Sequence, residues 1–591
     1  MGSQRGADMI AEYLQREGVR HVFTLCGHGN VGMLDALVDR APEISTISVH
    51  HESVAGFMAD AYFRVLGRPA VTLTSCGPGS ANLPIALANA LMDSSAFLAI
   101  TGNVPTSQFN REPFQESGYH FQADFPSVVR PYVKRSLQAT RTEQLPTMLR
   151  VAFSLMLSQP FGPVNLDVPF DVFAEQSDEP LPDPSAWHAR VSGHQGAAPG
   201  DIDKVVGMLQ AAERPLLVAG RSAGVGEAAD QLLALAEQLA LPVAWTPDGK
   251  GCIDGRHPLA IGATGRNGTL TANRAASNAD LIIAVSASFD DRATSSWLNG
   301  YTFTIPPTRL VQVDVDVRKL ARNYPVELAI VADPATFLRQ LQEAFRAGAS
   351  HEEVRWQPWR GRIAEWRREW DEHAQPRRLD DAVPIRPERL LADLRSVFPE
   401  DGILLSDVGV HHNWIVQEWE AWRPNTLLQT WGFGAMGFGA AGALGAKVAA
   451  PDRAVLAVVG DGGFLMNASV VATAVEYDLP VIWLVWNNGG YISIRDIQRG
   501  YLGREFVTTF SRRNAQPYSP DYAALARSMG ASAHRVTKPA EVAESVRDAL
   551  DHQRPCVIDV LVDSERGPVG TGTWELSPLG HPEPVFAPAM P

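Results

Sequence analysis

The most informative pattern of apolar and polar positions lies in the last third of the chain. An unbroken apolar run at residues 455–459 predicts a buried strand, and Gly-Asp-Gly-Gly follows it at 460–463. After a segment of helical length, a second apolar run at 480–486 ends in a pair of asparagines. This order predicts a βαβ unit of a parallel sheet, in which ligands bind at the carboxyl ends of the strands. Asp461 and Asn488 are therefore expected at the same edge of one sheet.

Short apolar strands alternate with helical segments in two other parts of the chain. This alternation predicts an α/β fold class, with three doubly wound parallel-sheet domains at residues 1–175, 190–350 and 380–570. A stretch rich in Pro, Gly and charged residues, near 176–200, separates the first two domains. A Gly/Pro-rich tail at 571–591 follows the third domain, and it either covers a site or is disordered.

The composition of the chain restricts the classes of function that it can have. The chain has 591 residues, 45% of them apolar, and its formal net charge of −15 argues against a nucleic-acid surface. The basic and aromatic residues at 351–380 have helical spacing and favour an amphipathic connecting helix instead. The four cysteines are far apart and lack metal-ligand spacing. No apolar stretch is long enough for a signal peptide or a membrane span, so we expect a cytoplasmic protein.

The residues at the two strand ends have the chemistry of a metal–phosphate site. Carboxylate, amide and backbone carbonyl oxygens are hard ligands suited to Mg²⁺, and a helix N-terminus adds partial positive charge for phosphates. Gly-Asp-Gly alone is a weak motif, but here 24 residues separate it from Asn-Asn at the next strand end. The combination resembles the diphosphate-binding motif of thiamine diphosphate (ThDP)-dependent enzymes. The resemblance implies Mg²⁺ held by Asp461, Asn488 and the carbonyl of Gly490, with Gly462 and Gly463 beside the diphosphate.

Glu52 follows a predicted strand at the start of a helical segment. A glutamate in that place is, by itself, more often a surface residue that complements the helix dipole. The surrounding order of strand, HHESVAGFMADAY, strand and SCGPGSANL resembles the pyrimidine-binding domain of ThDP enzymes. In that family one glutamate hydrogen-bonds the aminopyrimidine ring and so promotes deprotonation of the cofactor's C2 carbon. The resemblance assigns this catalytic role to Glu52.

Three other residues of the first domain are expected near the reactive end of the cofactor. His28 lies in the loop LCGHGN at a strand end, where a proton-transfer role and a solvated loop histidine are the alternatives. Gln115 lies in EPFQES, which resembles the Phe-Gln-Glu of acetohydroxyacid synthases. Cys76 stands where these enzymes commonly carry glycine, and we expect a small buried thiol there rather than a reactive one.

Two glycine-containing segments precede the Gly-Asp-Gly motif in the third domain. DVGVHHNW resembles the loop that meets the diphosphate, which implies contacts from Gly409 and from His411 as a hydrogen-bond donor. TWGFGAMGFGAAGALGA resembles the glycine-rich turn of the family, and its Met436 lies 25 residues before Asp461. In the family a large apolar residue at this point separates the two rings of the cofactor, a role that the resemblance gives to Met436.

The middle domain contains GATGRNG and SASFDDR, which resemble loops of the central domain of flavin-containing acetohydroxyacid synthases. The resemblance implies FAD as a further cofactor. Relatives with this fold also carry a different nucleotide or none, so FAD and an empty domain remain alternatives. The residues implied for FAD are Gly220, Arg221, Gly265, Arg266, Asp291, Arg292, Asp314 and Asp333.

The resemblance to an acetohydroxyacid synthase-like ThDP enzyme of the FAD-containing branch covers nearly the whole chain. It implies a lyase or transferase with ThDP, Mg²⁺ and FAD that acts on 2-oxo acids or diketones, foremost as a decarboxylating carboligase using pyruvate. Ile497 stands where the synthases carry a substrate-selecting Trp. Together with His28 and Cys76, it keeps open a hydrolase that opens a cyclic 1,2-dione, as cyclohexane-1,2-dione hydrolase does.

A flavin-dependent pyruvate oxidase is a third alternative, and a catalytically inactive binding or scaffold protein is disfavoured by the presence of Glu52, Asp461 and Asn488. The implied partners are a small-molecule substrate and further copies of the chain, as a homodimer or as a homotetramer built from two dimers.

Overall fold

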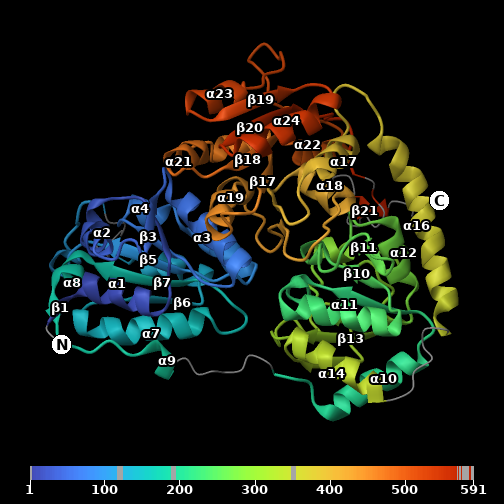
Figure 1. Ribbon diagram of the computed structural model, residues 1–591, viewed down its shortest axis with the longest axis horizontal. Helices are drawn as coiled ribbons and strands as arrows, with labels where there is room; N and C mark the ends of the chain where they lie inside the picture. The colour runs from blue at the N-terminus through green and yellow to red at the C-terminus, as the bar shows by residue number, and fades with distance from the viewer. Residues whose placement is uncertain are drawn as a thin grey trace.

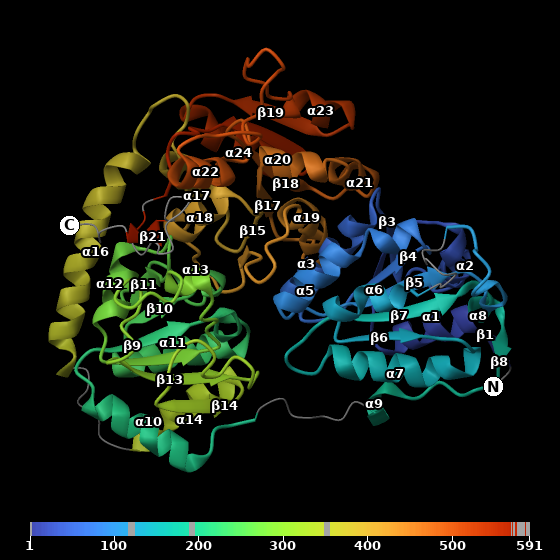
Figure 2. The same cartoon turned by 180° about the vertical axis from the view of Figure 1, so that it is seen from behind.

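The structure is a computed structural model that describes residues 3–115, 124–187, 195–347, 355–568, 570, 574–575 and 585–586. Three α/β domains follow one another along the chain, and the third lies between the other two (Figures 1 and 2). Among the described residues, no helix has the length and apolar character that crossing a membrane requires.

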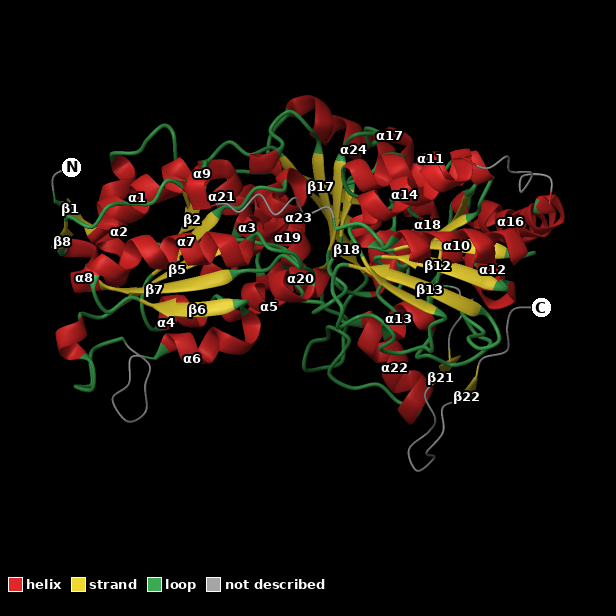
Figure 3. Cartoon of the chain, turned by 90° about the horizontal axis from the view of Figure 1, so that it is seen from below, coloured by secondary structure: helices red, strands yellow, loops and turns green. Residues whose placement is uncertain are grey.

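The first domain is a parallel sheet flanked by helices (Figure 3). Its strands lie in the order β3-β2-β4-β5-β7-β6, and every pair is parallel. The strands are β2 (His21–Thr24), β3 (Ser45–Ser48), β4 (Val71–Thr74), β5 (Leu98–Asn103), β6 (Arg135–Gln138) and β7 (Val164–Pro169). The helices are α1 (Gly6–Arg16), α2 (Val31–Val38), α3 (Glu52–Leu66), α4 (Pro78–Ala81), α5 (Pro84–Met92), α6 (Phe125–Val129), α7 (Leu145–Met156) and α8 (Phe170–Ala174). A short antiparallel pair, β1 (Gln4–Arg5) with β8 (Gln176–Ser177), closes the domain, and α9 (Pro184–Trp187) follows it.

The central domain is a second parallel sheet, with strands in the order β11-β10-β9-β12-β13-β14. These strands are β9 (Pro215–Ala219), β10 (Val243–Trp245), β11 (Ala260–Ala263), β12 (Leu281–Val285), β13 (Arg309–Asp314) and β14 (Leu328–Val331). The helices are α10 (Pro199–Ala211), α11 (Glu227–Leu239), α12 (Leu270–Asn278), α13 (Asp291–Thr294) and α14 (Pro334–Ala347).

The third domain is a parallel sheet in the order β16-β15-β17-β18-β20-β19. Its strands are β15 (Ile403–Ser406), β16 (Leu427–Leu428), β17 (Val455–Gly460), β18 (Val481–Asn487), β19 (Ser532–Val536) and β20 (Cys556–Leu561). Its helices are α17 (Pro387–Val397), α18 (Val410–Glu418), α19 (Phe438–Ala449), α20 (Asp461–Met466), α21 (Val470–Glu476), α22 (Ile492–Leu502), α23 (Tyr522–Ser528) and α24 (Ala540–His552). The three parallel α/β sheets confirm the predicted fold class.

The strand order of each sheet fixes where ligands can bind. If the strands of each sheet are numbered in chain order, the first and third sheets have the same arrangement. In both, the first strand lies between the second and the third. The central sheet instead has the order 3-2-1-4-5-6, which is typical of dinucleotide-binding folds. In such sheets the crevice opens where the connections reverse direction, at the topological switch point. These points lie between β2 and β4, between β9 and β12, and between β15 and β17.

The first and third domains meet through α3 and α19, which pack closely against each other. A β-carbon at Gly445 would lie 2.0 Å from the carbonyl oxygen of Met58, so the backbones touch where a side chain has no room. Arg64 of α3 stacks its guanidinium 4.6 Å from the ring centroid of Phe438 and donates a hydrogen bond to the Gln429 carbonyl at 2.6 Å. The contact is therefore both tightly packed and polar.

The aromatic and basic segment at 351–380 forms the connecting helix α16 (Gln357–Arg378), as its spacing predicts. It lies along the outer side of the central domain and leads to the third domain (Figures 1 and 2). Trp359, Trp366 and Trp370 are buried at helical intervals, and the Trp359 indole donates a hydrogen bond to the Pro215 carbonyl at 3.0 Å. These tryptophans serve packing.

The predicted tail at 571–591 falls largely outside the described residues. Only β21 (Trp574–Glu575) and β22 (Val585–Phe586) are described there, and they pair in antiparallel fashion. Apart from β8, which lies just beyond residue 175, the sheets and helices of the three domains lie within the predicted segments 1–175, 190–350 and 380–570, whose exact boundaries stay predictions.

Candidate active site

A cavity of about 360 Å³ lies at the switch point of the third domain, where β15 and β17 end. All of the third-domain residues predicted to contact the cofactor or the metal line this cavity. They are Gly409, His411, Met436, Asp461, Gly462, Gly463, Asn488 and Gly490. The register of the sheet explains why, because Gly460 is paired with Trp486 and both strands end at the same edge.

Asp461 is a buried carboxylate ringed by backbone donors. Its Oδ2 accepts hydrogen bonds from the N–H groups of Asn488, Gly489 and Gly490 at 3.2, 2.7 and 3.0 Å. Its Oδ1 accepts one from Gly462 at 2.7 Å. Burial raises the pKa of Asp461 to about 6, and the four N–H groups partly offset this by stabilising the charged form.

The turn that supplies these donors depends on glycine. Gly489 and Gly490 have φ angles of +78° and +151°, which side chains rarely adopt. A β-carbon at Gly490 would also lie 2.3 Å from the carbonyl oxygen of Thr508. The chain can therefore point three successive N–H groups at one carboxylate only because both positions are glycine.

His411 presents a ring nitrogen that no described residue satisfies. Its Nε2 is buried and has no hydrogen-bond partner in the described part of the chain, and the residue lines the cavity. Burial lowers the pKa of His411 to about 4, so the ring is neutral near pH 7. An orphaned polar atom of this kind fits a site that binds a polar ligand.

A second buried carboxylate, Asp407, shapes the glycine-rich turn. Its two oxygens accept hydrogen bonds from the Gly437 N–H at 2.8 and 3.0 Å, and burial raises its pKa to about 6. Gly437 has a φ of +94° and is the N-cap residue of α19, directly after Met436. Asp407 thus fixes the backbone next to Met436, which lines the cavity.

The first-domain candidates gather at the switch point between β2 and β4. The Cys76 sulfur lies 3.3 Å from Nε2 of His28, whose ring stacks near Phe114 with centroids 6.3 Å apart. Glu52 is 7% exposed, and its Oε2 accepts a hydrogen bond from the Asn82 amide at 2.9 Å.

Gln115 joins the same cluster through its backbone. Gly77 has a φ of +56°, and a β-carbon on it would lie 1.5 Å from the carbonyl oxygen of Gln115. A β-carbon on Gly79 would lie 3.2 Å from Oε1 of Glu52. The segments that contain Glu52, His28, Cys76 and Gln115 therefore converge, although they are separate in sequence. Residues 116–123, which follow Gln115, are outside the described part.

Among the described residues, the first-domain cluster does not contribute to the third-domain cavity. None of the described residues lining the third-domain cavity comes from the first domain. The groups predicted to act on one cofactor are therefore divided between two separate surfaces of a single chain.

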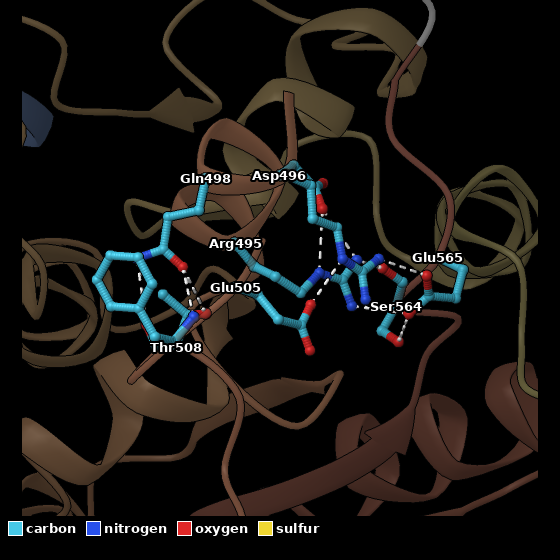
Figure 4. Close-up of polar contacts among 9 residues, drawn as sticks. Arg495, Asp496, Gln498, Glu505, Thr508, Ser564 and Glu565 are labelled. Atoms are coloured by element: carbon cyan, nitrogen blue, oxygen red, sulfur yellow. Dashed lines mark hydrogen bonds and ion pairs between the residues drawn. The ribbon is translucent and has the colours of Figure 1, made fainter. Parts of the chain in front are cut away.

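Helix α22 leaves the cavity and is anchored by charges (Figure 4). Its residue Ile494 lines the cavity, whereas Ile497 is an exposed apolar residue outside that lining. The buried Arg495 binds Glu565 at 2.8 Å and also donates a hydrogen bond to the Ser564 carbonyl. Glu565 also pairs with Arg499, one turn further along α22, at 2.7 Å. These contacts tie the cavity-lining helix to the segment that follows β20.

A cavity of about 450 Å³ lies at the switch point of the central domain, between β9 and β12. Residues after both strands line it, including Arg221 and Ser286, and all three domains contribute to its wall. Arg221 donates a hydrogen bond to the Asp93 carbonyl of the first domain at 2.6 Å, and burial lowers its pKa to about 10. Asp291 and Arg292 line this cavity and the third-domain cavity, so the two spaces are neighbours.

The residues predicted to bind FAD are divided by this geometry. Arg221, Asp291 and Arg292 line the cavity, whereas five others are not among its described lining residues: Gly220, Gly265, Arg266, Asp314 and Asp333. Gly220 allows the backbone to approach the Ser286 carbonyl closely, and Gly265 allows the same at the Arg292 carbonyl. Arg266 donates to Ser296, Asp314 accepts the Asp316 N–H, and Asp333 caps α14 through Thr336.

The sequence does not predict the contacts of several polar groups in these sites. Asn82, the partner of Glu52, and Asp407, the partner of Gly437, lie inside the motifs SCGPGSANL and DVGVHHNW, but only the fold shows what they contact. His412 stacks on Trp431 at a centroid distance of 3.8 Å, and Trp431 lines both cavities. In the sequence, only the position of His412 directly after His411 points to the contact between His412 and Trp431.

Comparison with known protein families agrees with this division of the chain. Residues 4–123, 202–341 and 407–560 match the N-terminal TPP binding domain, the central domain and the C-terminal TPP binding domain of thiamine pyrophosphate enzymes, respectively. The chain belongs to the thiamine pyrophosphate (ThDP) enzyme family. The match of both outer domains to TPP binding domains makes ThDP its cofactor.

The similar curated proteins place this ThDP enzyme in the acetohydroxyacid synthase-like group. It is 32% identical over 574 residues to the probable acetolactate synthase large subunit of Methanocaldococcus jannaschii, covering 95% of this chain and 92% of the relative. It is 30% identical over 576 residues to the acetolactate synthase isozyme 3 large subunit of Escherichia coli, covering 94% and 95%. The large subunit of Parasynechococcus marenigrum acetolactate synthase is 33% identical over 563 residues, covering 94% and 87%.

Proposed function

We propose that this ThDP enzyme is a Mg²⁺-dependent decarboxylating carboligase that uses pyruvate as acyl donor. The observation that carries the proposal is the third-domain cavity, where a buried carboxylate, a turn of backbone N–H groups and an unpartnered histidine nitrogen converge. Relatives that match over nearly their whole length are named acetolactate synthases, which supports pyruvate as the donor.

The donor set of the cavity fits a magnesium ion that faces a diphosphate. Asp461 supplies a carboxylate, and the Asn488 side chain and the Gly490 carbonyl supply neutral oxygens. The Gly490 carbonyl accepts the Ile492 N–H at 3.0 Å, which leaves its second lone pair for the metal. The described residues contain no cluster of three His, Cys, Asp or Glu side chains that could hold a metal. A hard ion with one carboxylate and neutral oxygens therefore suits this site better than a transition metal.

Each further residue has a distinct task. When bound, ThDP supplies a nucleophilic carbon that adds to a carbonyl group and accepts the electrons of the broken C–C bond. With its proton on Nε2, His411 would donate a hydrogen bond to the diphosphate, and Met436 would contact the bound cofactor. Glu52 would hydrogen-bond the pyrimidine ring, and Asn82 holds one carboxylate oxygen of Glu52 in place. His28 would exchange a proton with the substrate, and Gln115 would act near it.

Arg292 lines both cavities and brings a guanidinium to the site, with Asp291 3.9 Å from its Nε. A guanidinium there suits the carboxylate of a 2-oxo acid. Helix α22 presents Ile494 to the same cavity, so the space for an acceptor is apolar on that side.

A second candidate function is hydrolytic opening of a cyclic 1,2-dione. The observation that favours it is the His28–Cys76 contact, which places an ionisable ring among the groups expected at the reactive end.

The deciding experiment incubates the purified protein with ThDP and Mg²⁺ and a panel of 2-oxo acids and cyclic diketones, with product analysis and an oxygen electrode. Acetolactate or a related ligation product from pyruvate supports the carboligase. Ring opening supports the hydrolase, and oxygen uptake with pyruvate supports an oxidase. Absence of turnover with every compound contradicts the proposal.

We also propose that the central cavity binds FAD. The dinucleotide-type strand order, the cationic Arg221, Arg292, Lys319 and Arg322, and the position of the cavity at the switch point support it. The purified protein should then be yellow, with a flavin absorption spectrum and flavin released on denaturation. A colourless protein that takes up no FAD on reconstitution would contradict this part of the proposal.

We further propose that two chains build each active site, as a homodimer or as a homotetramer of two such pairs. The division of the predicted groups between two surfaces of one chain supports this, because a compact cofactor must be reached by both. Exposed apolar side chains near the third-domain cavity, among them Phe433 and Ile494 in its lining, suit coverage by a second copy.

A further inference from the structure

A side-chain pair, His28 with Cys76, lies at the switch point of the first domain. His28 lies in the short helix η1 (His28–Asn30) just after β2, and Cys76 lies two residues after β4. These two strands are neighbours whose connections run in opposite directions, so their ends form the crevice in which such sheets bind ligands. The sulfur of Cys76 meets Nε2 of His28 there, at 3.3 Å.

The structure around Cys76 leaves its sulfur little freedom. Cys76 is 2% exposed, and the neighbouring Ser75 accepts a hydrogen bond through its Oγ from the Gly29 N–H at 3.1 Å. A β-carbon on Gly29 would lie 3.1 Å from the Cys76 sulfur, so the loop after β2 packs closely against the loop after β4. In contrast, His28 is exposed, with Phe114 stacked near one face of its ring. The fixed partner is therefore the cysteine, and the histidine ring is the part that needs orientation.

We propose that Cys76 is a positioning residue for His28, an inference that rests on the proposed function of the site. Sulfur contact at Nε2 fixes the rotation of the ring and leaves Nδ1 as the nitrogen that exchanges a proton with the oxygen of the substrate carbonyl. A proton given to that oxygen is replaced from solvent, to which His28 is exposed. Cys76 itself does not touch the substrate.

The choice of a thiol has a chemical reason. A carboxylate in contact with Nε2 would favour the charged imidazolium, whereas a neutral thiol is a weak partner that can donate or accept. Cys76 thus orients the ring without fixing its charge, which suits a group that must both give and take a proton.

A double-mutant cycle tests the pairing. The variants are His28→Ala, Cys76→Ala, the double variant, and Cys76→Ser, which keeps a small hydrogen-bonding group. We expect Cys76→Ala to slow pyruvate turnover about threefold to tenfold, and Cys76→Ser to restore most of it. The double variant should be no slower than His28→Ala, because both substitutions remove one function. Hydrogen–deuterium exchange at C2 of bound ThDP, which reports on Glu52, should be the same in all four.

The measurement that needs no turnover is the reaction of His28 with diethyl pyrocarbonate in the protein without cofactor, followed by peptide mass spectrometry. Release of Nε2 in Cys76→Ala should speed carbethoxylation of His28 severalfold, while Cys76→Ser should stay near the wild-type rate. Equal rates in wild type and Cys76→Ala, or additive losses of turnover in the cycle, would overturn the inference. A wild type that neither exchanges C2 nor converts pyruvate contradicts the proposed function instead, and the carbethoxylation rates still decide the pairing.

Discussion

Glu52 combines burial with a polar neighbour that fixes its geometry. One carboxylate oxygen accepts the Asn82 amide, and the other lies against the backbone of Gly79, where a β-carbon would come within 3.2 Å. The first position of α3 places the carboxylate at the helix N-terminus, where negative charge is favoured. The residue is thus held as a hydrogen-bond acceptor near a strand end rather than as a mobile surface group.

We predict that Glu52→Gln binds ThDP but loses turnover, because the amide can occupy the site and cannot accept or stabilise a proton as the carboxylate does. A loss of about a hundredfold or more is expected for a group of this kind. Fluorescence titration with ThDP and deuterium exchange at its C2 carbon are the two measurements. Exchange at the wild-type rate in the variant would refute the role of Glu52, and Asn82→Ala should give a smaller loss in the same assays.

His411 provides a test of the diphosphate side. Removal of one hydrogen bond to a charged ligand costs about 1.5 kcal/mol or more, so His411→Ala should weaken ThDP binding about tenfold. His411→Gln retains an N–H donor and should keep most of the affinity. Isothermal titration in the presence of Mg²⁺ compares the three proteins. Equal loss in both variants would mean that shape, rather than donation from the ring, determines the binding.

The lowered pKa of His411 also predicts a pH effect on the stability of the cofactor-free protein. Because burial places this pKa near 4, below the ordinary value of 6.5, the unfolded chain binds the proton first as the pH falls. The contribution of His411 to stability is therefore present above pH 6.5 and is lost between about 6.5 and 4. Denaturant unfolding should show a steeper loss in this window for wild type than for His411→Gln, in which the buried carboxylates are unchanged. Parallel curves would contradict the assignment.

At the scale of elements, the turn between β18 and α22 is the part whose backbone shape matters most. Ala at position 490 would have to adopt a φ near +151° and would clash with the Thr508 carbonyl. We predict that Gly490→Ala costs about 1–3 kcal/mol of stability and weakens Mg²⁺ and ThDP binding at least tenfold. Thermal unfolding and ThDP titration measure both.

Gly500 is the matched control in the adjoining helix. It lies within α22, and a β-carbon there would meet no atom within 4 Å. Gly500→Ala should leave cofactor affinity unchanged and stabilise the protein by up to about 1 kcal/mol, since alanine favours a helix. If Gly490→Ala behaved like this control, the turn would not depend on its backbone shape.

The elements themselves follow closely from local sequence, whereas contacts between them do not. Val455–Gly460 and Val481–Asn487 are strands because their apolar runs suit a sheet that is buried on both faces. The pairing of Cys76 with His28 joins residues 48 positions apart, and no periodicity encodes it. The same holds for Asp407 and Gly437, because a buried carboxylate is matched to a turn only after the chain folds. For the proposed FAD site, the motif resemblance predicted the loops, but not which of their side chains line the cavity.

At the scale of the whole molecule, the separation of Glu52 from Asp461 leads to a prediction about assembly. Glu52→Gln and Asp461→Ala should each be inactive alone, since one lacks the proposed pyrimidine contact and the other the carboxylate of the proposed metal site. When subunits are mixed under exchanging conditions, a hybrid dimer has one site with both defects and one with neither, so activity should return. Native mass spectrometry verifies the exchange.

The outcome of this mixing distinguishes shared sites from sites within one chain. Verified exchange without recovered activity would reject sharing, and an active monomer by analytical ultracentrifugation would reject it outright. Two copies of Glu52→Gln, mixed after differential labelling, are the control, because no combination of them contains an intact site.

The close contact of α3 with α19 limits which amino acids these helices tolerate. A β-carbon at Gly445 would meet the Met58 backbone, so this position cannot enlarge without driving the first and third domains apart, whereas one at Gly442 would lie 3.1 Å from Ala61 and would require a smaller shift. Neither glycine lines the described active-site cavities, yet inherited variation at Gly445 should be as restricted as at a catalytic residue, and variation at Gly442 somewhat less so. A saturation library selected for folded protein would then show intolerance along this helix pair, with Gly207 and Gly361, where a β-carbon meets open space, accepting most small residues. We therefore expect evolution to change the cavity-lining residues of α22 much faster than the small residues that join the first and third domains.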